Sequence, residues 1–282
     1  YDGWSTSILI RFFANEYQRI RSELPLPKNE RPCPPRFWLA CAAPSVMRSA
    51  VPYFREYLKG YRDPLPKRSE RGLRYNDKGY WNRSVPISYP ELQKAASRYQ
   101  VTGAALMIAV IGICLCRMYL VQDMISGIVF SGRTPSMPYA ESIVGPFINV
   151  LPLRLPPAYD WNENVYSYIQ TVGRDLVDLG EYQAVPLPSI LENVKERSFI
   201  PFHTVIAIQN YPIDYKSLSL ETNDIQIRYI RSRYYPLNDL TIEMKLFQNS
   251  CLLELCYTKS ILPIQNVYQL TQNIIEGLQK LL

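Results

Sequence analysis

The chain of 282 residues is 47% hydrophobic and 20% charged, a balance that is normal for a soluble globular protein of one large or two ordinary domains. Its net charge of +6 is dispersed, because basic and acidic residues alternate between positions 67 and 78, and this favours a solvated loop over a nucleic-acid-binding patch. Six cysteines without a Cys-x-x-Cys pair and a single histidine argue against a zinc or other metal site, and the default for such thiols is the reduced, cytoplasmic state.

The first predicted element is a helix that begins directly after Asp2 and carries an apolar stripe. Asp2 can cap this helix, because its carboxylate accepts backbone N–H bonds and meets the positive end of the helix dipole. A natural polypeptide rarely begins without Met and one residue before a capped helix, so we expect an upstream part to be missing. The residues of the stripe are Ile8, Leu9, Phe12, Phe13, Tyr17 and Ile20.

Five prolines between residues 23 and 35 predict an extended linker, and therefore a boundary near residue 30 between two structural units. A helix is expected next over residues 46–58, with Pro52 restarting it and Gly60 ending it. Residues 61–80 are then expected to form a mobile, polar surface loop.

Two helices with recognisable caps follow this loop. Ser88 precedes Pro90 and Glu91, which is the pattern of a hydroxyl cap with a capping box, and it predicts a helix to about residue 98. Thr102 caps a nearly unbroken apolar run over residues 104–116. This run is too short to span a membrane, so a helix buried inside a domain is favoured over a transmembrane segment.

In the second half of the chain strands and helices alternate, which indicates an α/β sheet with helical cover. The strand over residues 125–131 is apolar on both faces, and the last two strands, joined at 248–250, have the alternating pattern of a hairpin. Asn162 or Asp160 is the candidate cap of the helix that ends at Gly180. The other predicted strands cover 203–209, 225–230, 240–247 and 251–257, and the predicted helices cover 165–180, 188–194 and 267–282.

Groups able to carry out proton transfer or nucleophilic attack are few. His203 is the only histidine, and its place at the opening of a strand favours a structural over a catalytic role. Ser5 and Ser131 have no base nearby in the sequence, so a serine nucleophile is not supported. The most site-like stretch is Ser131-Gly132-Arg133, because it places a flexible turn and a permanent cation together at the end of a strand.

Short stretches in order along essentially the whole chain carry a family resemblance. Residues 1–5 are similar to the tail of a His-His-x-x-x-Asp-Gly motif, and Gly132-Arg133 with residues 143–154 is similar to a Gly-Pro-Phe-Val-Asn-Thr-Leu-Pro-x-Arg signature. Residues 182–186 are similar to His-Gln-Asp-Tyr-Pro, with Tyr182 in place of the His, and further matches lie at 53–60, 101–102, 195–202, 209–212 and 239–241. Together these stretches resemble the condensation domains of nonribosomal peptide synthetases.

The resemblance implies the chloramphenicol-acetyltransferase-like α/β fold, in which two lobes form a V and tunnels from both sides meet at a catalytic histidine. On this basis residues 1–30 are the end of the N-terminal lobe and residues 31–282 are the C-terminal lobe. The rest of the N-terminal lobe is then an expected partner that the printed chain does not contain.

The resemblance also implies a reaction. In this family an aminoacyl acceptor attacks the thioester of an acyl or peptidyl donor, and both are held on the phosphopantetheine of carrier protein domains. The domain itself is expected to bind no cofactor, to have an adenylation domain as neighbour, and to be an acyltransferase of secondary metabolite biosynthesis in the cytoplasm. No nucleic acid or membrane is expected as a partner.

Both histidines of the resembled motif would lie before Tyr1, so the printed chain alone is expected to be inactive. The alternative is a non-catalytic, condensation-like module that docks carrier proteins or neighbouring domains.

The site residues are carried over from the same resemblance. Asp2 and Gly3 match the motif tail, and Asp2 is expected to pair with Arg133 and so to hold the histidine segment. Trp4, Asn149 and Asn210 are expected near the tunnel between the lobes. For Arg133 the alternative is a solvent-facing turn residue, and for the two asparagines it is a satisfied core amide.

Overall fold

The computed structural model of the chain describes residues 2–25, 44–65, 77–133, 137, 139–140, 142–156, 164–193, 202–209, 236, 238–247 and 249–282. Among these, six strands form one sheet in the order β1-β6-β5-β4-β2-β3. The strands are β1 (Lys78–Val85), β2 (Met124–Phe130), β3 (Asn149–Leu155), β4 (Thr204–Gln209), β5 (Leu240–Leu246) and β6 (Cys251–Thr258).

The central strands set which ends of the sheet share a side. β2, β4 and β5 are parallel neighbours, whereas β3, β6 and β1 pair antiparallel to the strands beside them. The carboxyl ends of β2, β4 and β5 therefore lie at one end of the sheet, and their amino ends lie at the other. The carboxyl end of β2 leads into the candidate site.

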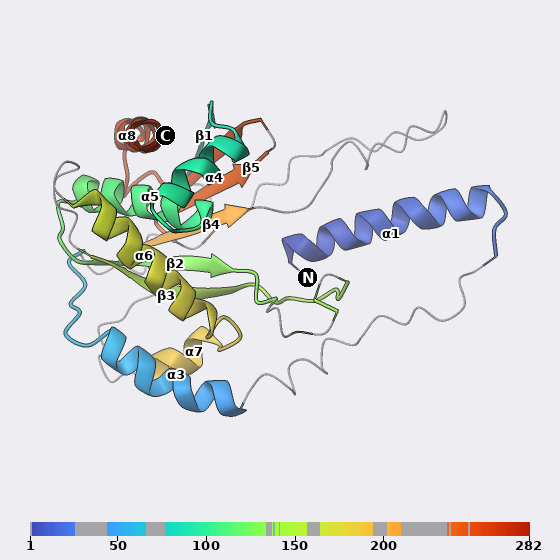
Figure 1. The fold of residues 1–282 in the computed structure, drawn as a ribbon, viewed down its shortest axis with the longest axis horizontal. Helices are drawn as coiled ribbons and strands as arrows, with labels where there is room; N and C mark the ends of the chain where they lie inside the picture. Colours follow the sequence, from blue (N-terminus) through green and yellow to red (C-terminus); the bar gives the residue numbers. More distant parts are fainter. Residues whose placement is uncertain are drawn as a thin grey trace.

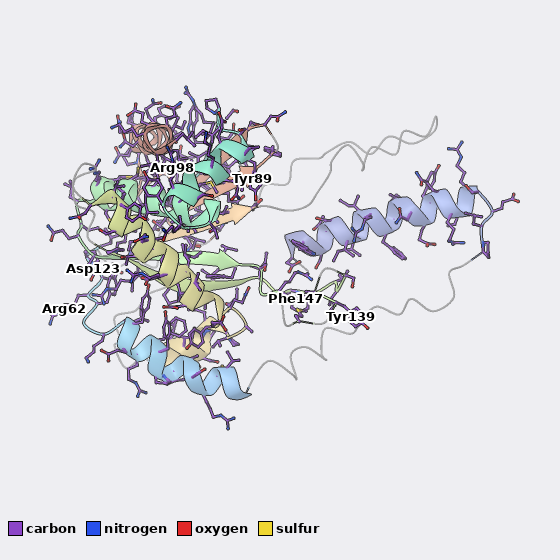
Figure 2. All side chains as sticks on the ribbon, viewed as in Figure 1. Arg62, Tyr89, Arg98, Asp123, Tyr139 and Phe147 are labelled. Atoms are coloured by element: carbon purple, nitrogen blue, oxygen red, sulfur yellow. The ribbon has the colours of Figure 1, made fainter. Side chains whose placement is uncertain are left out.

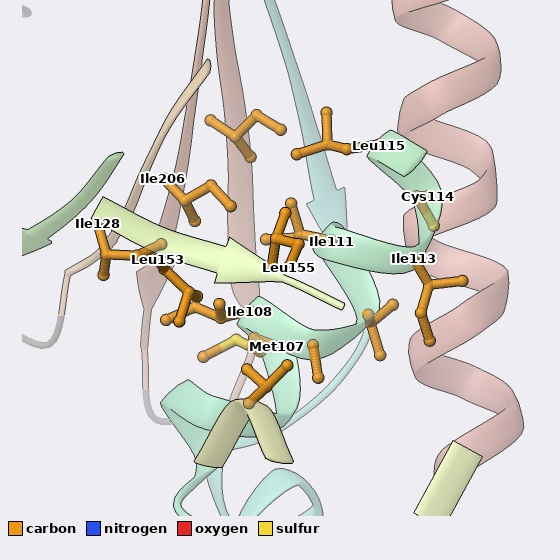
Figure 3. Close-up of a cluster of buried hydrophobic side chains, with 14 of the residues drawn as sticks. Met107, Ile108, Ile111, Ile113, Cys114, Leu115, Ile128, Leu153, Leu155 and Ile206 are labelled. Carbon is orange, nitrogen blue, oxygen red and sulfur yellow. The ribbon is translucent and has the colours of Figure 1, made fainter. Parts of the chain in front are cut away.

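One almost fully buried helix anchors the core. α5 (Gly103–Tyr119) packs between α6 (Val165–Gly180) and α8 (Ile264–Leu281) and contacts β3 and β4 (Figure 1). Figure 3 shows Ile108 and Ile111 of α5 gathered with Ile128, Leu153 and Ile206 of the sheet. The other helices are α1 (Gly3–Arg21), α3 (Pro44–Tyr57), α4 (Tyr89–Arg98) and α7 (Leu187–Asn193).

Three of the predicted caps are present. Asp2, Ser88 and Thr102 each accept a backbone N–H from the residue three positions later, and Ser88 with Glu91 forms a complete capping box. The exception is α6, which begins after Asn164 without a side-chain capping hydrogen bond, so neither Asp160 nor Asn162, which lie outside the described residues, is its N-cap. α5 is buried over residues 105–116, as predicted for a core helix. None of the described helices is by itself long and apolar enough to cross a membrane, and α4 with α5 meets that criterion only as a pair bent by 80°.

Strand β3 lies at the edge of the sheet, and this explains how it contains a proline. The N–H of Val150 donates to its neighbour Asn149 Oδ1, and the N–H of Arg154 donates to Tyr57 Oη of α3, so both point away from the ladder. Pro152 lies two residues from each, and its missing N–H therefore falls on the same outer edge. The sheet loses no hydrogen bond at Pro152, and α3 covers the edge.

Several sequence predictions need correction. The expected loop over residues 61–80 is wrong at its end, because Lys78 begins strand β1. The helix α3 is not restarted at Pro52 but runs through it, with Pro52 exposed to solvent, where water can bond the carbonyl that loses its partner. The strand β3 was not predicted. The linker, the boundary near residue 30 and the strand expected at 225–230 lie outside the described residues.

Helix α1 extends away from the sheet and meets the rest of the described chain at its amino end (Figure 1). Its predicted apolar stripe is largely uncovered, with Phe12 64% and Ile20 67% exposed. The stripe is therefore a surface of the described chain, whereas in the first turn of α1 Ser5 is buried and Trp4 is half-buried.

Candidate functional site

The site forms where the first turn of α1 meets the loop after β2. Asp2, directly before α1, is 8% exposed, and its carboxylate accepts hydrogen bonds both from α1 and from the loop after β2. Oδ1 accepts from Ser5 N at 2.8 Å and from Ser5 Oγ at 2.7 Å, while Oδ2 accepts from Phe147 N at 3.2 Å. Figure 2 shows Phe147 beside the start of α1. The cap of the helix is thus also the point where the loop is attached.

Arg133 supplies the charge that balances Asp2. Its Nη2 lies 3.2 Å from Asp2 Oδ1 and 3.3 Å from Oδ2, and the side chains of Arg133 and Asp2 are only 4% and 3% exposed. Its Nη1 donates to the carbonyl oxygens of Ala140 at 2.6 Å and Ile143 at 2.8 Å. One nitrogen therefore holds the carboxylate and the other holds the loop, so the pair is not a two-nitrogen fork and Arg133 is not a solvent-facing residue.

Ser5 completes the network and was not expected as a member. It is fully buried, and its Oγ accepts from Arg133 Nη2 at 3.2 Å and from Gly145 N at 3.0 Å. Its single proton can go either to Asp2 Oδ1 or to Gly145 O, which is 3.0 Å away. Only its position three residues after a helix cap could have signalled this role. We call Asp2, Ser5 and Arg133 the brace.

Gly132 permits the close approach that the brace requires. Its φ of +67° is in the left-handed region, and a Cβ atom at this position would lie 1.8 Å from the carbonyl oxygen of Phe147. A backbone atom cannot move away as a flexible side chain can, so only glycine fits. The Ser-Gly-Arg stretch predicted as a turn is therefore a turn whose glycine is required by packing.

Electrostatics favours the ionised form of Asp2. Burial opposes ionisation, but the hydrogen bonds from Ser5, the charge of Arg133 and the N–H of Phe147 outweigh it and hold the pKa of Asp2 below its usual value. Asp2 and Arg133 therefore form a buried ion pair in which Nη1 and Nη2 of Arg133 are hydrogen-bonded, whereas its buried Nε has no hydrogen-bond partner among the described residues. Removing one member of the pair would leave the other charge buried and unpaired.

Two aromatic rings flank the guanidinium of Arg133. The ring of Phe147 lies 4.7 Å from its Cζ, and the ring of Trp4 lies 5.8 Å from it. Trp4 is half-buried, and Gly3 is the first residue of α1. The motif tail is thus gathered around Arg133 by these contacts.

Asn149 makes no contact with the brace in the structure. Its Nδ2 donates to the carbonyl oxygens of Gln183 at 3.1 Å and Val185 at 2.6 Å, and its Oδ1 accepts from Val150 N. The Asn149 amide is therefore hydrogen-bonded within the domain, which was the alternative to a place in the tunnel. These bonds fix the turn after α6 against β3. Asn210 lies outside the described residues.

Tyr182, which replaces the histidine of its motif, packs as an aromatic residue. Its ring stacks on that of Tyr53 at 4.6 Å and meets that of Phe54 edge-on at 5.5 Å, so it joins the turn after α6 to α3.

His203 is remote from the brace, and its surroundings fit a structural role. It precedes β4, at the opposite end of the sheet from the loop after β2, and lies between two carboxylates. Its Nδ1 is 2.7 Å from Asp239 and its Nε2 is 3.3 Å from Asp63, and these bonds raise its pKa to about 9. Within the described ranges no group of three or more His, Cys, Asp or Glu side chains could hold a metal ion.

A family model and two curated relatives indicate the same family. A family model described as Condensation domain matches residues 1–282. Nonribosomal peptide synthetase 5 of Aspergillus fumigatus is 30% identical over 251 residues, which cover 85% of this chain and 11% of that protein. Surfactin synthase subunit 2 of Bacillus subtilis is 28% identical over 221 residues, which cover 76% of this chain and 6% of that protein. The chain spans about a tenth or less of the length of these relatives.

Solved structures agree at the level of the fold. The epimerization domain from the third module of tyrocidine synthetase B superposes with a TM-score of 0.74 at 12% identity, covering 99% of this chain and 66% of that one. The first condensation domain of the calcium-dependent antibiotic synthetase gives 0.71 at 16% identity, covering 98% and 61%. The mixed α/β fold expected from the sequence is confirmed, and the match of the family model over the whole chain shows that the protein belongs to the condensation-domain family.

Proposed function

We propose that this chain is part of a domain that forms an amide bond between a carrier-bound acyl or peptidyl donor and a carrier-bound aminoacyl acceptor. The acceptor nitrogen attacks the thioester carbonyl, the C–N bond forms as the C–S bond breaks, and the proton lost by the amine ends on the released thiol. Both substrates arrive on phosphopantetheine arms of carrier protein domains, with an adenylation domain as neighbour. The relatives, which are named as peptide and surfactin synthases, support this class of reaction.

The observation that carries this proposal is the buried brace. The second histidine of the resembled motif stands four positions before Asp2, outside the printed sequence. Asp2 lies within hydrogen-bond distance of four donor groups, Ser5 N, Ser5 Oγ, Phe147 N and Arg133 Nη2. The backbone that leads into Asp2 is thereby held against the loop after β2, and Asp2 and Arg133 act as positioning residues for the histidine that handles the amine.

The remaining predicted residues have separate roles in this proposal. Gly3 leaves room for the acceptor to approach the backbone, and Trp4 lines the tunnel while its ring lies near Arg133. Asn149 shapes the wall through its bonds to Gln183 and Val185 rather than by touching substrate.

Amide formation by the intact protein, with loaded donor and acceptor carriers, tests the proposal. Asp2→Asn keeps the size of the side chain but removes the charge opposite Arg133, and we expect about a 100-fold lower rate because the histidine segment shifts. The matched control is Asp123→Asn, which breaks another Asp–Arg pair with 30% and 36% exposed side chains on the far side of the sheet body from Phe147 (Figure 2). Asp123 and Arg154 form a half-exposed, two-nitrogen fork, so the control lowers stability, which the melting temperature records. Because the pair makes no hydrogen bond to the brace, the control should retain the rate.

Two outcomes would contradict the proposal. If the residue four places before Asp2 in the intact protein is not histidine, the catalytic role fails. If loaded carriers bind but no amide forms with any substrate pair, the protein is instead the non-catalytic docking module.

A further inference from the structure

A cavity of about 890 Å³ lies beside the brace and contains none of its residues. It lies between the first turns of α5, the middle of α6, and the carboxyl ends of the parallel strands β2 and β4. β2 and β4 are neighbours in the sheet. The chain leads from β2 to β3 on one side and from β4 to β5 on the other, so the connections diverge between β2 and β4. The crevice outside the carboxyl ends of strands at such a point is where α/β sheets bind ligands.

The floor of the cavity consists of buried and half-buried apolar side chains. Ile108 and Ile128, drawn in Figure 3, are 4% and 3% exposed, and Ala105 is also buried. Phe130 and Ile208, at the ends of their strands, are half-buried beside them. A polar or charged group placed on this floor would lose its hydration without a replacement partner, so the floor suits an apolar group.

The rim carries opposite charges and amide side chains together with the exposed side chain of Val177. Gln170, Arg174 and Asp178 recur every four residues along α6 and therefore share one helix face, with Arg174 and Asp178 exposed. Gln100 and Gln183 border the opening from other elements. A guanidinium and a carboxylate together offer no net charge, whereas amide side chains donate and accept hydrogen bonds. The opening therefore suits an uncharged chain that contains amide or ester-like groups.

The cavity touches the candidate site at two points. Ser131 lines it and accepts the backbone N–H of Arg133 at 3.2 Å, and Gln183 lines it while its carbonyl accepts from Asn149. A group bound in the cavity would therefore contact Ser131, which is two residues from Arg133 of the brace in the same loop.

We propose that this cavity receives the apolar side chain of one of the two acyl substrates and so selects for its size. The proposal rests on the amide-forming function above and names a substrate class, an uncharged aminoacyl or acyl group with a bulky apolar side chain. Volume supports it, since pockets for small ligands are typically about 300–1,000 Å³, mostly apolar, with few polar groups at the mouth.

A filling variant tests this assignment. Ala104 is half-buried in the first turn of α5 and lines the cavity, so Ala104→Phe places a ring inside it. Ser97 of α4 is exposed and does not line the cavity, so Ser97→Phe is the control that adds a ring elsewhere. Both variants are made in the intact protein, and melting temperatures are compared to verify folding.

The probes are leucyl and glycyl substrates, each loaded once as acceptor and once, N-acylated, as donor. We expect Ala104→Phe to lower kcat/KM for the leucyl probe by tenfold or more in one of these positions, with the glycyl probe unchanged. The position affected identifies the substrate that the cavity holds. Equal effects on leucyl and glycyl probes in both positions, or the same loss in Ser97→Phe, would overturn the proposal.

A binding measurement separates this proposal from the proposed function. Ligand-detected NMR with leucyl-N-acetylcysteamine thioester should show binding that Ala104→Phe weakens by about tenfold and Ser97→Phe does not. Binding that follows this pattern without any amide formation removes the proposed function and keeps the pocket. Amide formation with unchanged probe binding in Ala104→Phe removes the pocket and keeps the function.

Discussion

At the scale of single residues, the site depends on pairings between positions that are far apart in the sequence. The resemblance predicts Asp2 and Arg133 as a pair, whereas the sequence alone addresses Ser5 only as a nucleophile, which it does not support, and not as their hydrogen-bond partner. The structure explains the omission, since the partners of Ser5 Oγ besides Asp2 come from residues 133 and 145. Caps and turns can be predicted from a local sequence pattern, whereas the hydrogen-bond partners of a buried hydroxyl are set by tertiary packing.

His203 gives a pH-dependent prediction. Its bonds to Asp239 and Asp63 raise its pKa to about 9 from an ordinary value near 6.5, so the folded state binds the proton more tightly than the unfolded state. This contribution is complete below about pH 6.5 and is lost as the pH rises through 9. Allowing for partial solvent screening, we expect on the order of 1–3 kcal/mol of stability to be lost over that range.

Hydrogen exchange of the first residues of β4 and β5, measured between pH 6 and 10, checks this expectation, with correction for the intrinsic pH dependence of exchange. His203→Gln is the matched variant, because it keeps a hydrogen-bonding side chain but cannot carry the charge. An equal pH dependence in the variant and the unmodified protein would show that the imidazolium does not stabilise this end of the sheet.

At the scale of elements, the predictions succeeded where a pattern is local and failed at the edges of the sheet. The buried helix α5 and the hairpin β5–β6 were anticipated from an apolar run and an alternating pair. The sequence predicts a loop up to residue 80 and no strand over residues 81–85, because the edge strand β1 pairs only with β6 and exposes Asn82, Arg83 and Ser84. β3 was missed because Pro152 argues against a strand unless its missing N–H faces outward, and only the topology shows that it does.

Thr102 offers a test at this scale. Its side chain accepts the N–H of Ala105 at 3.1 Å at the start of the helix on which the core is built. We expect Thr102→Ala to destabilise the domain by about 1 kcal/mol, because one donor of the first turn loses its partner. Thr102→Ser keeps the hydroxyl and should restore most of the melting temperature. If both variants melt alike, the cap does not contribute.

At the scale of the whole molecule, the described chain is a sheet body with one helix that extends from it. The family fold has two lobes, and we expect the apolar stripe of α1 to be covered by the remainder of the N-terminal lobe in the intact protein. The sequence could indicate this stripe by its spacing, but it could not show that the stripe faces away from the sheet, since that depends on where Asp2 is anchored.

Phe12 and Leu120 allow a matched comparison, because they are 64% and 91% exposed in the described chain. In the intact protein we expect Phe12→Asp to lower the melting temperature by several degrees, since the charge is placed in a contact between lobes. Leu120→Asp, on the body away from α1, should change it little. Equal effects of the two substitutions would contradict a covered stripe.

A double-mutant cycle tests whether Asp2 and Arg133 act as one unit in support of amide formation. The rate of amide formation by the intact protein is compared for the unmodified form, Asp2→Asn, Arg133→Gln and the double variant. Because either single change disrupts the same brace, the double variant should be no slower than the worse single variant, which corresponds to a coupling above about 1 kcal/mol. Losses that add, or variants that retain the full rate, would contradict the account.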